Sequence, residues 1–531
     1  MPAPTRGPAS STSALPSASE VTMTTRTRWI ALAGISLAAV ACGDMLTETP
    51  KSFTTQDGFF KTPSDVRSAT FATYQPLGTD DLWRWWLWLT VDLASDQVRM
   101  HPDEPNYQTY HPEFLRWDAT TSSVTSPWNG LYNIVFRANV VLSRAGAVTF
   151  PDPAERQQLL AEATFLRGYA YLLLAKLYDD VPLFVSEADH DNARASRTPV
   201  AQVEAQVITD LTQAEAELPA TRPQSELGRA TKGAARMALA DLYLWRSSYR
   251  KTGEWQLAAD WAKKVIDSGI YGLNDDYLST FLPANHGNKE MIWVIPSSTV
   301  QGRSSMNLGC LILPRILGFG TGGGCEVIGQ PTAWHYASYL TGDYRKDVTY
   351  RTSGCSSDAN IGCKTFTWPN VYKYRPTNGG VGGPPDTDFP LYRYAEALLI
   401  YAEAQNELGN PAAAVTYLNM VRARARKGTG ADNRAEPHDY GTAGEATTQT
   451  AVRDAIFQER DWELAHEGKR WFDLLELDAL EPGYWATALQ QRDSIPPAAT
   501  LQRDLRTFKQ RWPIPLTEIN LDPALTQNTG Y

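Results

Sequence analysis

Four tryptophans stand within six residues, at Trp83, Trp85, Trp86 and Trp88, in a chain of 531 residues with 17 Trp. A flat indole ring with a polar edge suits the C–H face of a sugar. On a helix Trp85 and Trp88 fall on one side, and Trp83 and Trp86 nearly on another, so the four do not face one core. Because Trp is usually largely buried, rings wedged between helices are the alternative interpretation. The cluster predicts at least one exposed platform for a carbohydrate.

Polar and aromatic residues after this cluster complete the candidate ligand site. A loop-rich zone at 97–130 adds tyrosines, and Asp, Asn and Arg side chains there can satisfy sugar hydroxyls. The predicted ligand-binding residues are Trp83, Trp85, Trp86, Trp88, Asp96, Arg99, Tyr107, Tyr110 and Arg303.

Three glutamates, Glu459, Glu463 and Glu467, are spaced four apart on one predicted helix face. Two carboxylates about 5–10 Å apart can hydrolyse a glycoside. Basic residues are interleaved with these three, however, and this pattern is typical of an ion-paired helix. We therefore predict a structural role for the three glutamates.

The other patterns do not match a catalytic or cofactor site. The Gly-rich run 318–324 lacks the Lys-Ser/Thr of a phosphate-binding loop. The seven His form no HExxH motif, and no GxSxG motif occurs. A net charge of −10 argues against a nucleic-acid partner. The sequence thus predicts no enzyme, no cofactor and no metal.

The first 41 residues are typical of an export signal. Arginines precede an apolar run at 30–41, which is too short to span a bilayer and fits a secretory h-region. Small residues then precede Cys42, a pattern that resembles the site where bacterial lipoproteins are cleaved and acylated. An ordinary signal peptide with a chance Cys is the alternative. Translation starts at Met1 or Met23, and residues 42–531 are expected to form one domain.

Four cysteines follow Cys42, and an oxidising compartment allows them to form disulfides. Cys355 and Cys363 are eight apart in a polar loop, and Cys310 and Cys325 flank a Gly-rich loop. Local pairing of Cys355 with Cys363 and of Cys310 with Cys325 is favoured among the three connectivities. A zinc site is the alternative, but no pair has CxxC spacing.

Apolar residues recur at helical spacing over most of the chain. Residues 159–177 carry one apolar stripe with steps of three and four, and Pro182 follows. Further helices are predicted at 203–218, 231–245, 254–266, 391–408 and 411–424. Several pairs look like tetratricopeptide-type hairpins, in which a Gly turn precedes an Ala-rich second helix and small side chains let the helices approach closely.

Residues 271–390 depart from this helical pattern. Gly and Pro cluster there, and the only strand-like runs are 291–295 and 371–374. A loop-rich insertion of this size is more often functional than not. The expected fold is mainly α, with a helical scaffold at about 42–270 and 391–531 and few short strands.

Several specific motifs occur in a fixed order along the exported chain. They include Ala161-Glu-Ala-Thr-Phe-Leu-Arg167, Gly228-Arg-Ala-Thr-Lys-Gly233, Glu467-Gly-Lys-Arg-Trp-Phe-Asp473 and Trp512-Pro-Ile-Pro515. Together they resemble the SusD/RagB family of outer-membrane nutrient-uptake lipoproteins. Trp128, Trp471 and Trp512 lie inside such motifs, which are scaffold motifs, so no ligand-contacting residue is carried over from the family.

The resemblance implies a SusD-like scaffold of four tetratricopeptide-like helix pairs with a loop-rich part. It implies a lipoprotein anchored in the outer membrane and exposed at the cell surface, which binds oligosaccharides without catalysis. It also implies delivery of the ligand to a SusC-like TonB-dependent β-barrel transporter. The alternatives are a tetratricopeptide-type peptide-binding lipoprotein, serving peptide uptake or protein scaffolding, and a secreted glycoside hydrolase.

Overall fold

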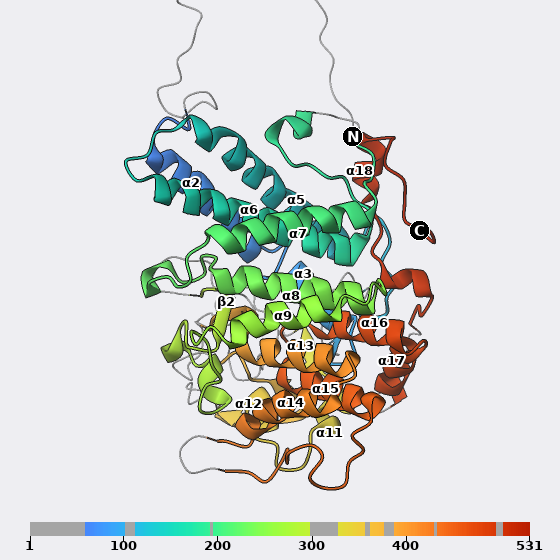
Figure 1. Ribbon diagram of the computed structural model, residues 1–531. Coiled ribbons are helices and arrows are strands. Elements are labelled where there is room, and N and C mark those ends of the chain that lie inside the picture. The colour runs from blue at the N-terminus through green and yellow to red at the C-terminus, as the bar shows by residue number, and fades with distance from the viewer. Residues whose placement is uncertain are drawn as a thin grey trace, which may run out of the picture. The chain divides into compact units, whose positions relative to one another are not determined.

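Helices stacked in successive layers make up most of the computed structural model (Figure 1). The structure describes residues 59–100, 112–191, 195–297, 328–355, 362–375, 387–428, 433–494 and 503–531. The stacked helices are α2 (Pro63–Tyr74), α5 (Ser122–Arg144), α6 (Pro153–Tyr178), α7 (Val200–Glu217), α8 (Lys232–Ser248), α9 (Trp255–Ile266), α13 (Tyr394–Glu407), α14 (Pro411–Ala425) and α15 (Gln449–Glu463). Each helix from α5 to α9 packs on the next one, α9 packs on α13, and α13 packs on α14 and α15. The predicted mainly α fold is confirmed.

Helix α6 shows how local sequence fixes the ends of these elements. The Asp152 side chain accepts a hydrogen bond from the Ala154 N–H, and Pro153 occupies the first helical position, where a missing N–H costs nothing. The helix ends at Tyr178 because Asp179 adopts a left-handed backbone conformation with φ of 66°. The apolar stripe predicted at 159–177 is therefore part of one long, well-capped helix.

Small side chains allow α8 and α9 to pack closely. Ala234, Ala238, Ala258 and Ala262 are all fully buried in these two helices. An Ala side chain lets helix backbones approach, whereas a larger one holds them apart. The predicted Ala-rich hairpin is therefore present at α8 and α9.

Three antiparallel two-stranded sheets join segments that are distant in sequence. They pair β1 (Val98–Met100) with β3 (Gly329–Pro331), β2 (Met291–Ile295) with β6 (Phe389–Arg393), and β4 (Tyr350–Cys355) with β5 (Cys363–Val371). The register places Val98 opposite Pro331, Met291 opposite Arg393 and Tyr350 opposite Val371.

Two predicted elements need correction. The helix expected over 391–408 begins only at Tyr394, because Phe389–Arg393 is a buried strand that pairs with β2. The strand expected at 371–374 is the last residue of β5 and a short extension beyond it. After Val371 the chain leaves the strand, and the Tyr372 N–H donates to the Thr349 carbonyl at the end of α12 (Tyr344–Thr349). The strands β1, β3, β4 and β5 lacked a recognisable pattern because they are short or polar.

The segment 503–531, which contains α18 (Leu516–Leu521), returns to the end of α6. The Trp512 N–H donates to the Leu177 carbonyl at 2.8 Å, and the Asn528 side-chain amide donates to the Tyr178 carbonyl at 2.9 Å. These bonds satisfy carbonyls that the last turn of α6 leaves unpaired. The end of α6 is thus closed by residues about 350 positions later in sequence.

Every helix within the described residues is too short or too polar to cross a bilayer.

Candidate functional site

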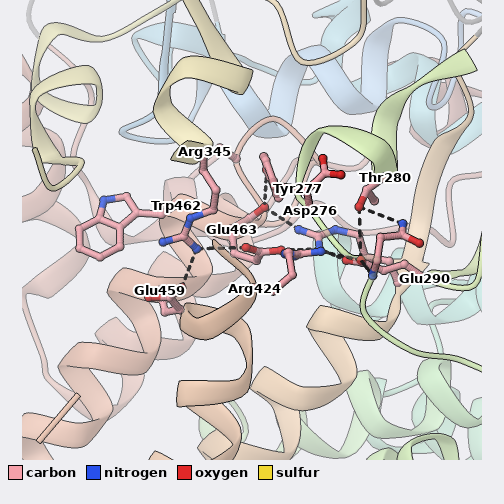
Figure 2. Close-up of polar contacts among 12 residues, drawn as sticks. Asp276, Tyr277, Thr280, Glu290, Arg345, Arg424, Glu459, Trp462 and Glu463 are labelled. Carbon is pink, nitrogen blue, oxygen red and sulfur yellow. Dashed lines mark hydrogen bonds and ion pairs between the residues drawn. The ribbon is translucent and has the colours of Figure 1, made fainter. Parts of the chain in front are cut away.

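The three spaced glutamates lie in a buried ion network that joins four parts of the fold. Figure 2 shows the part of this network around Glu459 and Glu463. Glu459 and Glu463 lie on α15, but Glu467 lies beyond the end of that helix. Arg345 donates to Glu459 and Glu463 at 2.5 and 3.0 Å. Arg393 of β6 donates to Glu463 at 2.7 Å. The glutamates are ion-paired, but the predicted pairing within the helix is wrong. Their partners among the described residues come from other elements, and the interleaved Arg460, Lys469 and Arg470 pair with Asp473, Glu396 and Asp96 instead.

Charge compensation in this network is close to complete. Arg393 also contacts Glu290 at 2.8 Å and Glu467 at 2.8 Å, and Arg424 of α14 contacts Glu290 at 2.6 Å and also pairs with Glu463. Burial alone would raise the pKa of Glu463, but the guanidinium groups around it outweigh burial and lower that pKa. Because these carboxylates are buried and paired, the network holds elements together and presents no surface to a ligand.

Two of the four clustered tryptophans are buried, so their predicted contact with a ligand is corrected. Trp88 is fully buried in α3 (Trp86–Leu93), and its indole N–H donates to the His466 carbonyl at 3.1 Å. Trp83 is 3% exposed and packs against Phe389, with ring centroids 5.6 Å apart. Both rings are buried, as the alternative interpretation predicted, but the contacts described here are with strand β6 and with the segment after α15.

Asp96 is also corrected as a ligand contact. Its carboxylate is fully buried and accepts two hydrogen bonds from the Arg470 guanidinium, each 2.8 Å long. Because the side chain is fully buried and paired with Arg470, the Asp96 carboxylate presents no surface to a ligand. Arg99 lies on β1, opposite Gln330 in the register, and is partly buried. Burial lowers the pKa of Arg99, although the nearby Glu113 acts in the opposite direction.

Trp85 and Trp86 are the partly exposed members of the cluster. Trp85 precedes α3 and Trp86 begins it. Their rings meet edge to face, with centroids 6.3 Å apart and planes inclined at 68°. Two rings inclined in this way present faces in different directions, which suits a bent ligand more than a flat one. Of the predicted tryptophans, these two have surface that a ligand can reach.

A cavity of about 860 Å³ lies beside the residues that lead into this pair. It is bounded by α2, η2 (Gln75–Gly78), the segment 225–229 and the end of β2. Phe71 is 45% exposed, and the Arg229 guanidinium lies 4.8 Å from its ring centroid. On the other side Arg84 pairs with Asp80 at 3.0 Å. The cavity therefore combines an aromatic face with charged groups that can donate and accept hydrogen bonds.

This cavity was not predicted from the sequence. Phe71 and Arg229 are 158 positions apart, and Arg229 stands in the scaffold motif 228–233, for which no ligand contact was predicted. The sequence signal for this cavity was local: the charged residues Asp80 and Arg84 lie within five residues before Trp85.

The remaining predicted site residues lie largely outside the described part of the chain. Tyr107, Tyr110, Arg303, Cys42, Cys310 and Cys325 fall outside the described residues.

Cys363 is disulfide-bonded, and Cys355 stands opposite it in the register of β4 and β5. This placement suits the predicted Cys355–Cys363 pair. Within the described residues, no group of three or more His, Cys, Asp or Glu is arranged to hold a metal ion.

Family models match most of the described fold. A model described as the SusD family matches residues 289–531, and one described as "Starch-binding associating with outer membrane" matches residues 86–244. SusD-like protein P2 of Formosa agariphila is 30% identical, over 83% of this chain and 88% of its own length. Starch-binding protein SusD of Bacteroides thetaiotaomicron is 25% identical, over 71% of this chain and 74% of its own length.

Solved structures share the same architecture. A laminarin-binding SusD-like protein superposes with a TM-score of 0.70 at 22% identity, covering 89% of this chain and all of its own. At that identity the likeness concerns the fold alone. Together with the relative at 30% identity and the two family models, it places the layered helices in one known architecture. The chain belongs to the SusD family.

Proposed function

We propose that the protein is a lipoprotein at the outer-membrane surface that binds oligosaccharides without catalysis. The observation that carries this proposal is the partly exposed Trp85–Trp86 pair, which directly follows Arg84 in the lining of the 860 Å³ cavity, in a chain of the SusD family. Relatives and structural neighbours named for starch or laminarin binding support a carbohydrate ligand.

The two indole faces supply stacking for sugar rings, while Arg84 and Asp80 supply donors and acceptors for hydroxyls. Such a site gives micromolar to millimolar affinity, about −8 to −4 kcal/mol. Weak binding suits a protein that must release its ligand. We therefore expect capture followed by delivery to a SusC-like TonB-dependent transporter in the same membrane.

Anchoring would come from Cys42. Cleavage before this residue and acylation of its thiol place several acyl chains in the membrane, and each buried CH₂ contributes about 0.8 kcal/mol. We expect Cys42→Ser to move the protein from the membrane fraction to the soluble fraction of the envelope. Recovery of the variant in the membrane fraction would contradict a lipid anchor. Pull-down from detergent-solubilised membranes tests the transporter partner.

Isothermal titration against a glycan panel tests carbohydrate binding. The panel contains maltohexaose, laminarihexaose, cellohexaose, xylohexaose, mannohexaose and hexagalacturonate. Binding of at least one member should weaken about tenfold in Trp85→Ala and in Trp86→Ala, because truncating an aromatic anchor costs more than about 1 kcal/mol. Trp261→Ala is the matched control, since Trp261 is a partly exposed Trp on α9.

The outcomes separate the alternatives. Binding to no member of the panel would overturn the carbohydrate proposal, and binding to peptides instead would favour peptide uptake. Hydrolysis of any bound hexasaccharide, measured by product release, would contradict the non-catalytic assignment.

A further inference from the structure

A second pocket, of about 660 Å³, lies against another face of α5. Trp128, Tyr132 and Phe136 are spaced four apart on that helix, so their side chains line up along one face. The Trp128 and Tyr132 ring centroids are 4.7 Å apart, and Phe136 is 43% exposed. The helix therefore presents a row of three rings whose last member reaches solvent.

The opposite wall of this pocket comes from the chain after α6 and from α18. Phe184 meets Tyr132 edge to face at 5.9 Å, and His190 meets Phe136 edge to face at 5.0 Å. Leu521 of α18 is 78% exposed at the rim. The pocket is thus lined by aromatic rings from two segments and an apolar rim from a third.

Several polar residues line the pocket beside these rings. Glu518 of α18 lines the pocket, and among the described residues no hydrogen bond or ion pair reaches its carboxylate. Burial raises the pKa of Glu518, so its carboxylate is partly withdrawn from water. Asn129 and Asn133 bring exposed amides, and Asp522 adds a second carboxylate. None of the described lining residues is Lys or Arg.

This combination of aromatic rings, amides and carboxylates favours one class of ligand. Aromatic faces carry negative charge and attract the C–H faces of a pyranose ring. Amides and carboxylates then accept or donate hydrogen bonds to hydroxyls. Two carboxylates, with no Lys or Arg among the described lining residues, disfavour uronic acids and sulfated sugars, because like charges brought together cost free energy. The volume falls within the roughly 300–1,000 Å³ range of small-molecule sites.

We propose that this pocket is a second binding site for a neutral oligosaccharide, separate from the cavity beside Trp85 and Trp86. The inference rests on the proposed function and adds a site to it. Gly130 explains the separation, because it follows Trp128 by two residues and so lies about 200° around the helix. A Cβ on Gly130 would lie 2.8 Å from Leu82, which shows that the segment leading to Trp85 packs on that other side of α5.

Native mass spectrometry with the neutral hexasaccharide that binds best in the panel counts the occupied sites. Two bound molecules per chain are expected for the lipid-free protein starting at residue 43. Phe136→Ala and Glu518→Gln should each weaken the second binding step about tenfold. Leu257→Ala is the matched control, because Leu257 on α9 is 40% exposed and lies outside the pocket.

The double variant Trp85→Ala/Trp86→Ala distinguishes this inference from the function on which it rests. It should lose the first site and keep one bound hexasaccharide, which Phe136→Ala then removes. A single bound molecule in the parent protein, unaffected by Phe136→Ala, would overturn the second site and leave the proposed function intact. No bound molecule of any panel member would overturn both. Binding of a Lys-rich peptide that Glu518→Gln abolishes would contradict the carbohydrate assignment.

Discussion

Glu403 on α13 is a buried carboxyl group whose ionisation the fold opposes. It is 1% exposed, and in the described structure neither carboxylate oxygen has a hydrogen-bond partner. Burial raises its pKa well above the ordinary value, and the nearby Glu476 carboxylate raises it further. The folded state therefore keeps a proton that the unfolded chain releases above a pKa of about 4.5. This group contributes stability at low pH that is lost as the pH rises.

We expect Glu403→Gln to stabilise the protein at pH 8 and to have a smaller effect at pH 5. One unit of pKa shift corresponds to about 1.4 kcal/mol, and a gain of that order is expected. Urea unfolding at both pH values measures it. Glu407→Gln is the control with opposite sign, because Glu407 pairs with Arg453 at 2.6 Å. A loss of stability in Glu403→Gln at pH 8 would show that the carboxylate is charged and compensated.

The ionisation of His466 makes the folding stability depend on pH in the opposite direction. It is fully buried, and its Nε2 lies 2.8 Å from the Tyr350 hydroxyl. Burial, followed by the charges of His335 and Lys373, holds its pKa well below 6.5. The unfolded chain takes up a proton below about pH 6.5 and the folded state does not, so stability falls as the pH drops through that value.

His466→Asn should make the melting temperature less sensitive to pH between 7.5 and 5.5. Asn is chosen because His466 has a φ of 62°, a left-handed conformation that Asn tolerates well. Differential scanning calorimetry at both pH values gives the slope. An unchanged slope in the variant would assign the acid sensitivity to other groups.

At the scale of elements, Gly130 sets how closely the tryptophan segment approaches α5. A Cβ there would lie 2.8 Å from the Leu82 Cγ atom and 3.0 Å from the Asp81 Cβ atom. We expect Gly130→Ala to destabilise the fold by about 1–3 kcal/mol, although Ala has the better helix propensity. The added Cβ would overlap with Leu82, and relieving that overlap forces the packed side chains or backbone to shift. Glycan affinity should fall as well, since Trp85 and Trp86 follow the displaced residues.

Gly146→Ala is the matched control for this substitution. A Cβ at Gly146 would meet no atom within 4 Å. Urea unfolding and isothermal titration of both variants separate a general effect of Gly→Ala from the contact with Leu82. Equal stability of the two variants would show that the 81–82 segment moves away without cost.

Helical elements were predictable because their signal is local and repeated. The stripe in α6 and the Pro at the start of α14 can both be recognised from the sequence alone. The strand β6 was missed because its five buried residues run directly into a helix, and only pairing with β2 distinguishes them. Burial of the tryptophans was not predictable either. Trp88 is held by His466, 378 positions away, and nothing near Trp88 in sequence indicates that contact.

At the scale of the whole molecule, the buried ion network connects α12, β6, α14 and α15. Arg393 is fully buried and contacts Glu290, Glu463 and Glu467. We expect Arg393→Met to destabilise the protein by about 3–5 kcal/mol, because it leaves buried carboxylates without compensation. Lys263→Met is the control, since Lys263 and Asp267 form an exposed pair worth less than about 1 kcal/mol.

Denaturant unfolding at low and high ionic strength checks this prediction. The buried network should be insensitive to salt, because ions do not screen charges that water cannot reach. A loss below 1 kcal/mol in Arg393→Met would indicate that water enters the network and compensates the remaining charges.

The closure of α6 by residues 512–528 has a consequence for the order of events during synthesis. The carbonyls of Leu177 and Tyr178 find their partners only after more than 330 further residues have been made. At about 5–20 residues per second, that interval is roughly 20–70 s. Helix α6 is therefore translated early, whereas the last carbonyls at its end gain their partners only when the C-terminal segment is present.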